Sequence, residues 1–169
     1  MKHIIYFSQK PVRSGLSSIP DGAICGNGDL AVILGNSPDG MRLYLSKCDL
    51  WEAIERHDAG GVKPLGFIDI PVPADLYAQY SVEQDMDKAE IRCRFVRNGR
   101  HCAFTVTVCK TENAVCIRNT GNVPLQPVLR VFDGETTGRK GEFAQDGVQG
   151  IFRSFDEKAA CLKRMCLRL

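Results

Sequence analysis

The feature that most constrains this chain is a strict alternation of side chains beside one tight turn. From Ala89 to Phe95 apolar residues recur at every second position, and charged residues fill the positions between them. A period of two places the two sets on opposite faces of a β-strand. Asn98-Gly99 follows, and its preference for positive φ angles suits a two-residue hairpin turn. The sequence therefore predicts a hairpin with one buried face, returning along residues 101–110.

Similar strand and turn signals recur along the chain. The stretches expected to form strands are 30–34, 41–45, 65–70, 89–95, 101–110, 114–118 and 124–132. Turn-forming residues separate several of them, as at Ser37–Gly40 and Glu112-Asn113. Short strands at such spacing are typical of a sandwich or barrel. We therefore expect a single all-β domain over residues 1–169, folded as an antiparallel β-sandwich.

Helix and loop signals are few. Residues 50–56 could form one or two helical turns, and glycines within 58–63 and 136–147 predict loops. The C-terminal stretch is ambiguous, because Ser154 and Glu157 could form a capping box before apolar residues at helical spacing. The same stretch could instead be a final strand, and the sequence leaves both structures open.

Size and charge exclude several classes of protein. The 169 residues suffice for one domain with a sizeable core, and the net charge of +2 comes from scattered basic and acidic residues. No apolar run approaches the roughly 20 residues of a membrane span. Residues 4–7 form an apolar run far shorter than a signal-peptide core. We expect no nucleic-acid or membrane partner, and a cytoplasmic location unless an upstream export signal was removed.

The chain has eight cysteines, an even number that invites a disulfide interpretation. Their spacing does not favour one, since no CxxC pair exists. Cys93, Cys102 and Cys109 lie at strand-like positions among apolar or β-branched residues, where a free cysteine behaves as a small buried hydrophobe. Buried free thiols are expected, with disulfides or a metal site as the alternatives. No metal site or cofactor is predicted.

The most distinctive short segment is Cys25–Leu30, which reads CGNGDL. Its two glycines permit backbone angles that other residues resist, and Asn27 tolerates the left-handed region. The segment could simply be a tight turn that starts a strand, or it could present Asn27 and Asp29 to a polar ligand. It lacks the third glycine and the following helix of a dinucleotide fingerprint.

A second segment, Leu45–Glu52, holds the only tryptophan of the chain. Sugar rings pack their C–H faces on aromatic side chains, and carboxylates accept hydrogen bonds from hydroxyls. Asp49, Trp51 and Glu52 could therefore contact carbohydrate. The alternative is that Trp51 anchors a core or an interface while the acidic residues are solvated.

No catalytic constellation is marked in the sequence. Glycoside hydrolysis needs two positioned carboxyl groups, but no pair among the 20 acidic residues is distinguished by its context. His3, His57 and His101 are isolated along the chain, and neither a GxSxG nor an HExxH motif is present. No catalytic residue is assigned, and whether the chain is an enzyme stays open.

Taken together, these segments resemble a known family. Gly26–Val32, Leu43–Lys47 and Asp49–Trp51 are similar to the N-terminal domain of glycoside hydrolase family 95 and its uncharacterised bacterial relatives. That domain has a GNGxLG turn and strand, followed by a strand ending in N/K-x-D-x-W. Asp85–Ala89 and the hairpin after it are similar to the same domain's LD-L-x-x-A segment. One departure is Ala31, where the family often has glycine.

The resemblance spans about residues 20–131 and implies a supersandwich, a large two-sheet fold similar to galactose-mutarotase-like domains. In such enzymes the catalytic carboxylates belong to a later (α/α)₆ barrel of several hundred residues, which is absent from this chain. The sandwich domain of these enzymes is itself usually longer than this chain. The resemblance thus implies a non-catalytic N-terminal domain, truncated or whole, that packs on a barrel. The residues expected to contact carbohydrate are Asn27, Asp29, Asp49 and Trp51.

Two other functions remain open. The chain could be a stand-alone structural or interaction module that forms a homo-oligomer through exposed sheet edges. It could also be a small mutarotase-like carbohydrate enzyme, which would need an acid and a base facing one concave sheet.

Overall fold

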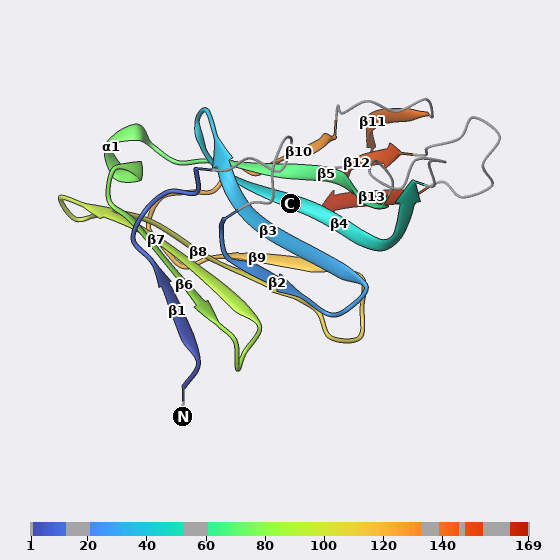
Figure 1. Ribbon diagram of the computed structural model, residues 1–169. Coiled ribbons are helices and arrows are strands. Elements are labelled where there is room, and N and C mark those ends of the chain that lie inside the picture. The colour runs from blue at the N-terminus through green and yellow to red at the C-terminus, as the bar shows by residue number, and fades with distance from the viewer. Residues whose placement is uncertain are drawn as a thin grey trace.

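The structure is a computed structural model that describes residues 2–12, 21–52, 61–132, 139–145, 148–153 and 163–168. In these ranges the chain forms antiparallel sheets, two of which face each other across a shared core (Figure 1). The protein is therefore an all-β antiparallel sandwich, as the alternation of side chains predicts.

The first sheet is built around the predicted hairpin. Its strands, in spatial order, are β1 (Ile4–Phe7), β6 (Tyr80–Asp85), β7 (Glu90–Arg97), β8 (Arg100–Val108) and β9 (Val115–Asn119). Asn98 and Gly99 join β7 to β8 with φ angles of 50° and 74°, the left-handed values that a two-residue hairpin turn requires. The hairpin prediction is confirmed except at its ends. Ala89 lies exposed in the preceding turn at φ 50°, and β8 ends at Val108 rather than at residue 110.

The second sheet contains the two distinctive sequence segments. Its strands, in spatial order, are β10 (Val128–Val131), β5 (Gly61–Pro71), β4 (Gly40–Glu52), β3 (Leu30–Ser37) and β2 (Ile24–Gly26). A short helix, α1 (Ala74–Tyr77), follows β5 and leads the chain across to the first sheet. The ring of Tyr77 lies 5.6 Å from that of Phe95, so α1 closes one end of the core.

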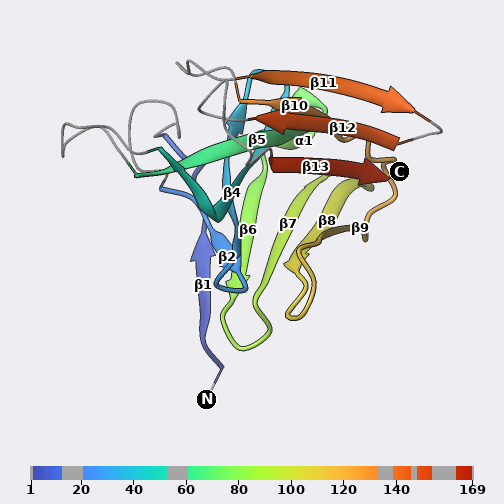
Figure 2. The ribbon, with the colours of Figure 1, turned by 90° about the vertical axis from the view of Figure 1, so that its right-hand side faces the viewer.

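A third sheet lies against the second, beside β10 and β5 (Figure 2). It consists of β11 (Lys140–Gln145), β12 (Val148–Arg153) and β13 (Lys163–Arg168). Ile151 of β12 is fully buried, and a Cβ atom added to Gly66 of β5 would lie only 2.3 Å from the Ile151 Cδ1 atom. The absence of a side chain at Gly66 thus allows the third sheet to approach the second.

The core lies between the first two sheets and follows the predicted alternation. Its fully or almost fully buried members include Val32, Leu34, Leu43, Leu45 and Ile70 from the second sheet, and Ile91, Cys93, Phe95, Cys102, Phe104 and Val106 from the first. Each inward position contributes apolar area whose removal from water stabilises the fold by about 25 cal/mol per Å². The buried side chains on the inward faces of β7 and β8 therefore fix the pairing register of these two strands.

Several local predictions were wrong. Residues 50–52, expected to be helical, continue β4, and residues 61–63, expected in a loop, belong to β5. The expected loop at 136–147 contains β11. In each case pairing with a neighbouring strand outweighs the weak local preference.

The ambiguous C-terminal stretch contains a strand, because β13 pairs with β12 over residues 163–168. The proposed capping box at Ser154 and Glu157 lies outside the described residues. Within the described part of the chain, no helix is long and apolar enough to span a membrane.

The cysteine prediction is confirmed in part. Six cysteines have described side chains, and all six are free thiols. Cys25, Cys93 and Cys102 are buried, but Cys109 is only half-buried, and Cys48 and Cys116 are exposed. The side chains of Cys161 and Cys166 lie outside the described residues.

Candidate functional site

The turn between β2 and β3 is organised by the side chain of Asn27. Its Oδ1 atom accepts hydrogen bonds from the backbone N–H groups of Asp29, at 3.0 Å, and Leu30, at 2.8 Å. Gly28, between Asn27 and Asp29, has a φ angle of 94°, a value that few side chains tolerate. The CGNGDL segment is therefore a tight turn, which was one of the two interpretations of its sequence.

Asn27 also joins the two sheets. Its Nδ2 atom donates hydrogen bonds to the carbonyl oxygens of Cys109, at 2.9 Å, and Glu112, at 3.4 Å, in the turn between β8 and β9. Figures 1 and 2 show the β2–β3 and β8–β9 turns lying side by side at the same end of the sandwich. Both polar atoms of the Asn27 amide are thus engaged within the protein, so Asn27 positions the site.

Lys47 connects the two distinctive segments. It lies on β4 opposite Leu30, and its Nζ atom is 2.7 Å and 2.9 Å from the two carboxylate oxygens of Asp29. The same Nζ atom is 3.2 Å from the Asp49 Oδ1 atom. We call Asn27, Asp29, Lys47 and Asp49 the polar corner. Its single cation is held between two carboxylates, which leaves a net negative charge.

The electrostatics of the polar corner follow from these contacts. Hydrogen bonds from Lys47, and then from the Cys48 thiol and the Asn113 side chain, lower the pKa of Asp29 to about 2. The hydrogen bond with Asp29 raises the pKa of Lys47, and it raises the pKa of the Cys48 thiol as well. At neutral pH Asp29 is ionised, Lys47 is charged and Cys48 is protonated.

The structure brings together three of the four predicted contact residues: Asn27, Asp29 and Asp49. Trp51 follows Asp49 by two residues on β4, and its backbone pairs with Val62. Its side chain lies outside the described residues. Lys47 and Asn113 were not selected from the sequence. The position of Lys47 inside the Leu45–Glu52 segment was a usable signal. The local sequence marks Asn113 only as a turn residue, and it reaches Asp29 through the packing of the two sheets.

The polar corner is suited to binding rather than to proton transfer. The side chains of Asp29 and Asp49 are 38% and 45% exposed, so their oxygens can accept further hydrogen bonds from hydroxyl groups. A general acid at neutral pH needs a raised pKa, and that of Asp29 is lowered. Among the described residues, no group of three or more His, Cys, Asp or Glu side chains could hold a metal ion.

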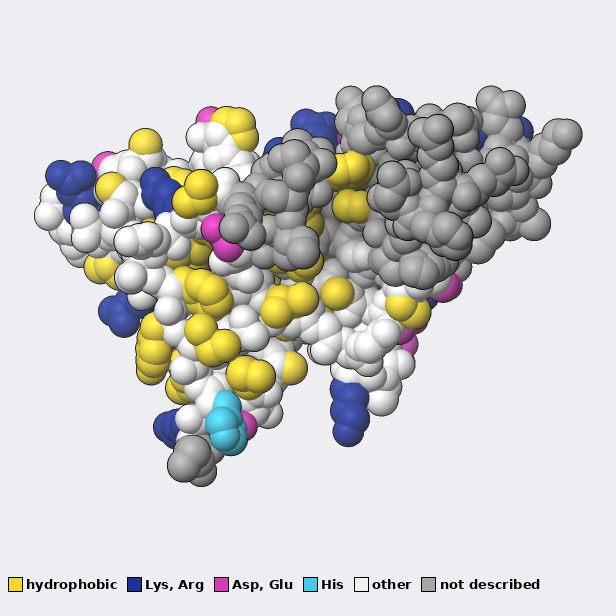
Figure 3. All heavy atoms as spheres, in the orientation of Figure 1, with side chains coloured by type: hydrophobic (Ala, Val, Ile, Leu, Met, Phe, Trp, Pro, Cys, Tyr) yellow, Lys and Arg dark blue, Asp and Glu magenta, His cyan; other side chains and the backbone are white. Residues whose placement is uncertain are grey.

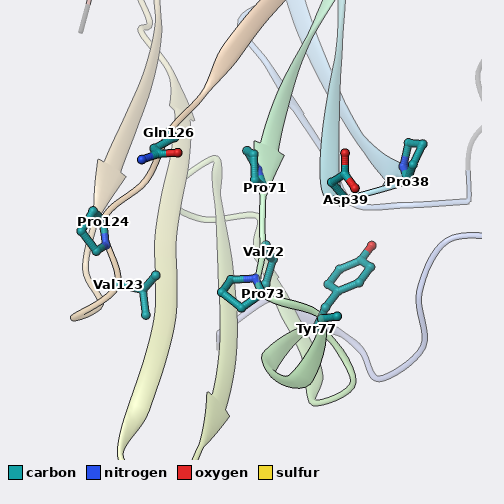
Figure 4. Close-up of a pocket in the computed structure, with 10 residues that line it drawn as sticks. Pro38, Asp39, Pro71, Val72, Pro73, Tyr77, Val123, Pro124 and Gln126 are labelled. Carbon is teal, nitrogen blue, oxygen red and sulfur yellow. The ribbon is translucent and has the colours of Figure 1, made fainter.

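A separate hollow of about 540 Å³ lies at the opposite end of β3 and β4 (Figure 4). It is lined by Pro38, Asp39, Pro71, Pro73, Tyr77 and Pro124, among others. The Tyr77 hydroxyl is engaged by Asn36. This hollow was not identified from the sequence, because its prolines come from three separate connections.

His3, although isolated along the chain, has a side-chain partner in the structure. Its Nδ1 atom is 2.8 Å from the Asp87 Oδ1 atom, and both side chains are exposed. The hydrogen bond from His3 lowers the pKa of Asp87. The pair lies where β1 meets β6, and the hollow near Tyr77 does not include it. His57 lies outside the described residues.

The fold and the polar corner define the class of protein as an antiparallel β-sandwich domain with a charged cluster at one end. Comparison with protein-family models finds no match, and comparison with curated proteins finds none either. The resemblance to glycoside hydrolase family 95 therefore rests on the sequence segments themselves.

Proposed function

We propose that this chain is the non-catalytic β-sandwich domain of a glycoside hydrolase, similar to the N-terminal supersandwich of family 95, and that it contacts carbohydrate at the polar corner. The observation that carries the proposal is the Lys47 bridge. It joins Asp29, from the family-like segment Gly26–Val32, to Asp49, from the family-like segment Asp49–Trp51. Two segments that resemble one family in sequence thus form one cluster in space.

The chemistry of the polar corner supports carbohydrate as the ligand. Sugar hydroxyls donate and accept hydrogen bonds, and charged partners make these bonds stronger than neutral ones. Asp29 and Asp49 offer acceptors at a partly exposed surface, and Lys47 holds the two carboxylates together. Trp51 lies two residues beyond Asp49 on the same strand and would supply the aromatic face.

A non-catalytic role agrees with the charge state of the cluster. Acid–base cleavage of a glycoside needs one protonated and one ionised carboxyl group. The lowered pKa of Asp29 makes it unsuitable as the proton donor. Cleavage in this proposal belongs to a separate (α/α)₆ barrel, against which the sandwich would pack.

Titration with neutral oligosaccharides, followed by the fluorescence of Trp51, tests the proposal. We expect a saturable change at millimolar sugar. Asp49→Asn should weaken binding about tenfold, because it removes one charge-assisted hydrogen bond. Asp39→Asn, at the opposite end of the sandwich, is the matched control and should bind as the wild type does. Equal affinity for all three proteins would contradict a site at the polar corner.

A second candidate function is a stand-alone module that pairs with another copy of itself. The observation that supports this function is the exposure of two apolar side chains on β1: Ile5 and Tyr6 are 44% and 69% accessible. Figure 3 shows hydrophobic side chains gathered on this face of the molecule. Strands at sheet edges with exposed apolar side chains readily add a further strand. Light scattering should then show a dimer that Tyr6→Lys dissociates, whereas a monomer at every concentration would exclude this function.

A further inference from the structure

Two thiols lie in contact at the edge of the first sheet. The Sγ atoms of Cys109 and Cys116 are 3.7 Å apart, on the connection that leaves β8 and on β9 respectively. Thr107 pairs directly with Cys116, so Cys109 is the diagonal neighbour of Cys116 across the two strands. The backbone N–H of Cys109 still donates to the carbonyl of Ala114, at 2.9 Å. The two side chains therefore share one face of the β8–β9 hairpin.

These thiols differ from the cysteines of the core in their access to solvent. Cys116 is exposed and Cys109 is half-buried, whereas Cys25, Cys93 and Cys102 are buried. Burial raises the pKa of the Cys25 thiol to about 11, and the contact with Cys116 also raises the pKa of Cys109, so the pair differs from the core thiols in its access to solvent. Cys48 is also exposed, but it donates its hydrogen bond to Asp29 rather than contacting another thiol.

We propose that Cys109 and Cys116 are a redox-active pair that undergoes thiol–disulfide exchange with low-molecular-weight disulfides. The Cys116 thiol loses its proton to solvent. The resulting thiolate attacks one sulfur of the small disulfide and releases the other half as a thiolate. The Cys109 thiolate then attacks the Cys116 sulfur, forms the Cys109–Cys116 bond and releases the second small thiol. Two protein thiols are oxidised, one small disulfide is reduced to two thiols, and the two protons pass to the leaving thiolates.

Formation of this bond would act on the polar corner through the backbone. The two sulfur atoms must move from 3.7 Å to a bonded separation of about 2 Å, which pulls on the β8–β9 connection. The carbonyl oxygen of Cys109 accepts the hydrogen bond from Asn27, and Asn27 in turn holds the β2–β3 turn. The oxidation state of the pair is therefore coupled to the position of Asn27. This proposal does not depend on carbohydrate binding.

Oxidised glutathione, added to the reduced full chain, tests the proposal. The intact mass should fall by about 2 Da, for two hydrogen atoms lost. Tryptic cleavage after Arg100, Lys110 and Arg118 should then yield residues 101–110 linked to residues 111–118. The side-chain amide resonance of Asn27 should shift on oxidation. Cys116→Ser and Cys109→Ser should each abolish the linked peptide. Cys48→Ser, which removes an exposed thiol that contacts no other thiol, should leave it unchanged.

Two results would overturn the proposal, and a third would remove only its coupling to the polar corner. A stable glutathione adduct on Cys116, without a linked peptide, would show that Cys109 does not reach the mixed disulfide. A linked peptide that still forms in Cys109→Ser would assign the bond to Cys102, the other cysteine of residues 101–110. An unchanged Asn27 amide resonance in the oxidised protein would remove the coupling to the polar corner.

Discussion

The side-chain amide of Asn27 donates a 2.9 Å hydrogen bond to the carbonyl oxygen of Cys109, which lies 82 residues further along the chain. This hydrogen bond connects the second sheet to the edge of the first, at the end of the sandwich where the polar corner lies. The same amide accepts hydrogen bonds from two backbone N–H groups of its own turn. One side chain thus fixes both the shape of the β2–β3 turn and its place against the β8–β9 turn.

Asn27→Ala should lower the free energy of unfolding by about 1–3 kcal/mol, because partly buried backbone groups lose their partners. Urea denaturation measures the loss. Asn122→Ala is the matched control, since Asn122 also bridges backbone groups, at His101 and Gly99, but within one sheet and in exposed positions. An equal or larger loss in Asn122→Ala would contradict the cross-sheet role of Asn27.

The Asp29 carboxyl group should titrate at a pH of about 2, compared with an ordinary value of 3.8. Because its pKa is lower in the folded chain, its ion pair stabilises the protein above pH 4. That stabilisation is lost as the pH falls from about 4 to about 2. Carboxyl-detected NMR measures the midpoint directly. Lys47→Met removes the strongest hydrogen bond to Asp29 and should raise the midpoint toward 3.8, and an unchanged midpoint would show that Lys47 is not the cause.

Gly66→Ala should destabilise the protein by about 1–3 kcal/mol, because overpacking at a tight contact forces the structure to shift. The new Cβ atom would lie 2.4 Å from the carbonyl oxygen of Arg130 on β10, which is backbone and cannot swing away. Gly141→Ala is the control, because its Cβ would meet only the outer end of the Phe152 ring, at 2.7 Å. Urea denaturation should show a smaller loss for Gly141→Ala, and the reverse order would contradict the close packing of β5 and β10.

Much of the fold was predictable because its strongest signals are local. The alternation from 91 to 95 and the Asn98-Gly99 turn define a hairpin without help from the rest of the chain. β1 and β6 were missed because their apolar residues follow no clear alternation, and β1 in addition pairs with β6 across 75 or more residues of sequence. The helical expectation failed at residues 50–52 because β4 continues through Glu52 against β5, and residues 53–56 lie outside the described residues.

The site was predictable only in part, because only some of its residues are marked by their local sequence. Asn27, Asp29 and Asp49 stand out because they flank glycines or a tryptophan in the sequence. Cys109, Cys116 and Asn113 join the same end of the sandwich only once the first sheet packs on the second. No local pattern distinguishes such residues from ordinary strand and turn positions.

Chemical-shift mapping of the ¹⁵N-labelled protein during titration with neutral oligosaccharides tests the central claim most directly. The proposal predicts progressive shifts for the backbone amides of residues 27–29 and 47–49 and for the indole of Trp51, reaching saturation at millimolar sugar. Shifts confined to Val72 and Tyr77 would place the ligand in the hollow at the opposite end. The absence of any shift at millimolar sugar would contradict a carbohydrate-contacting role for the polar corner.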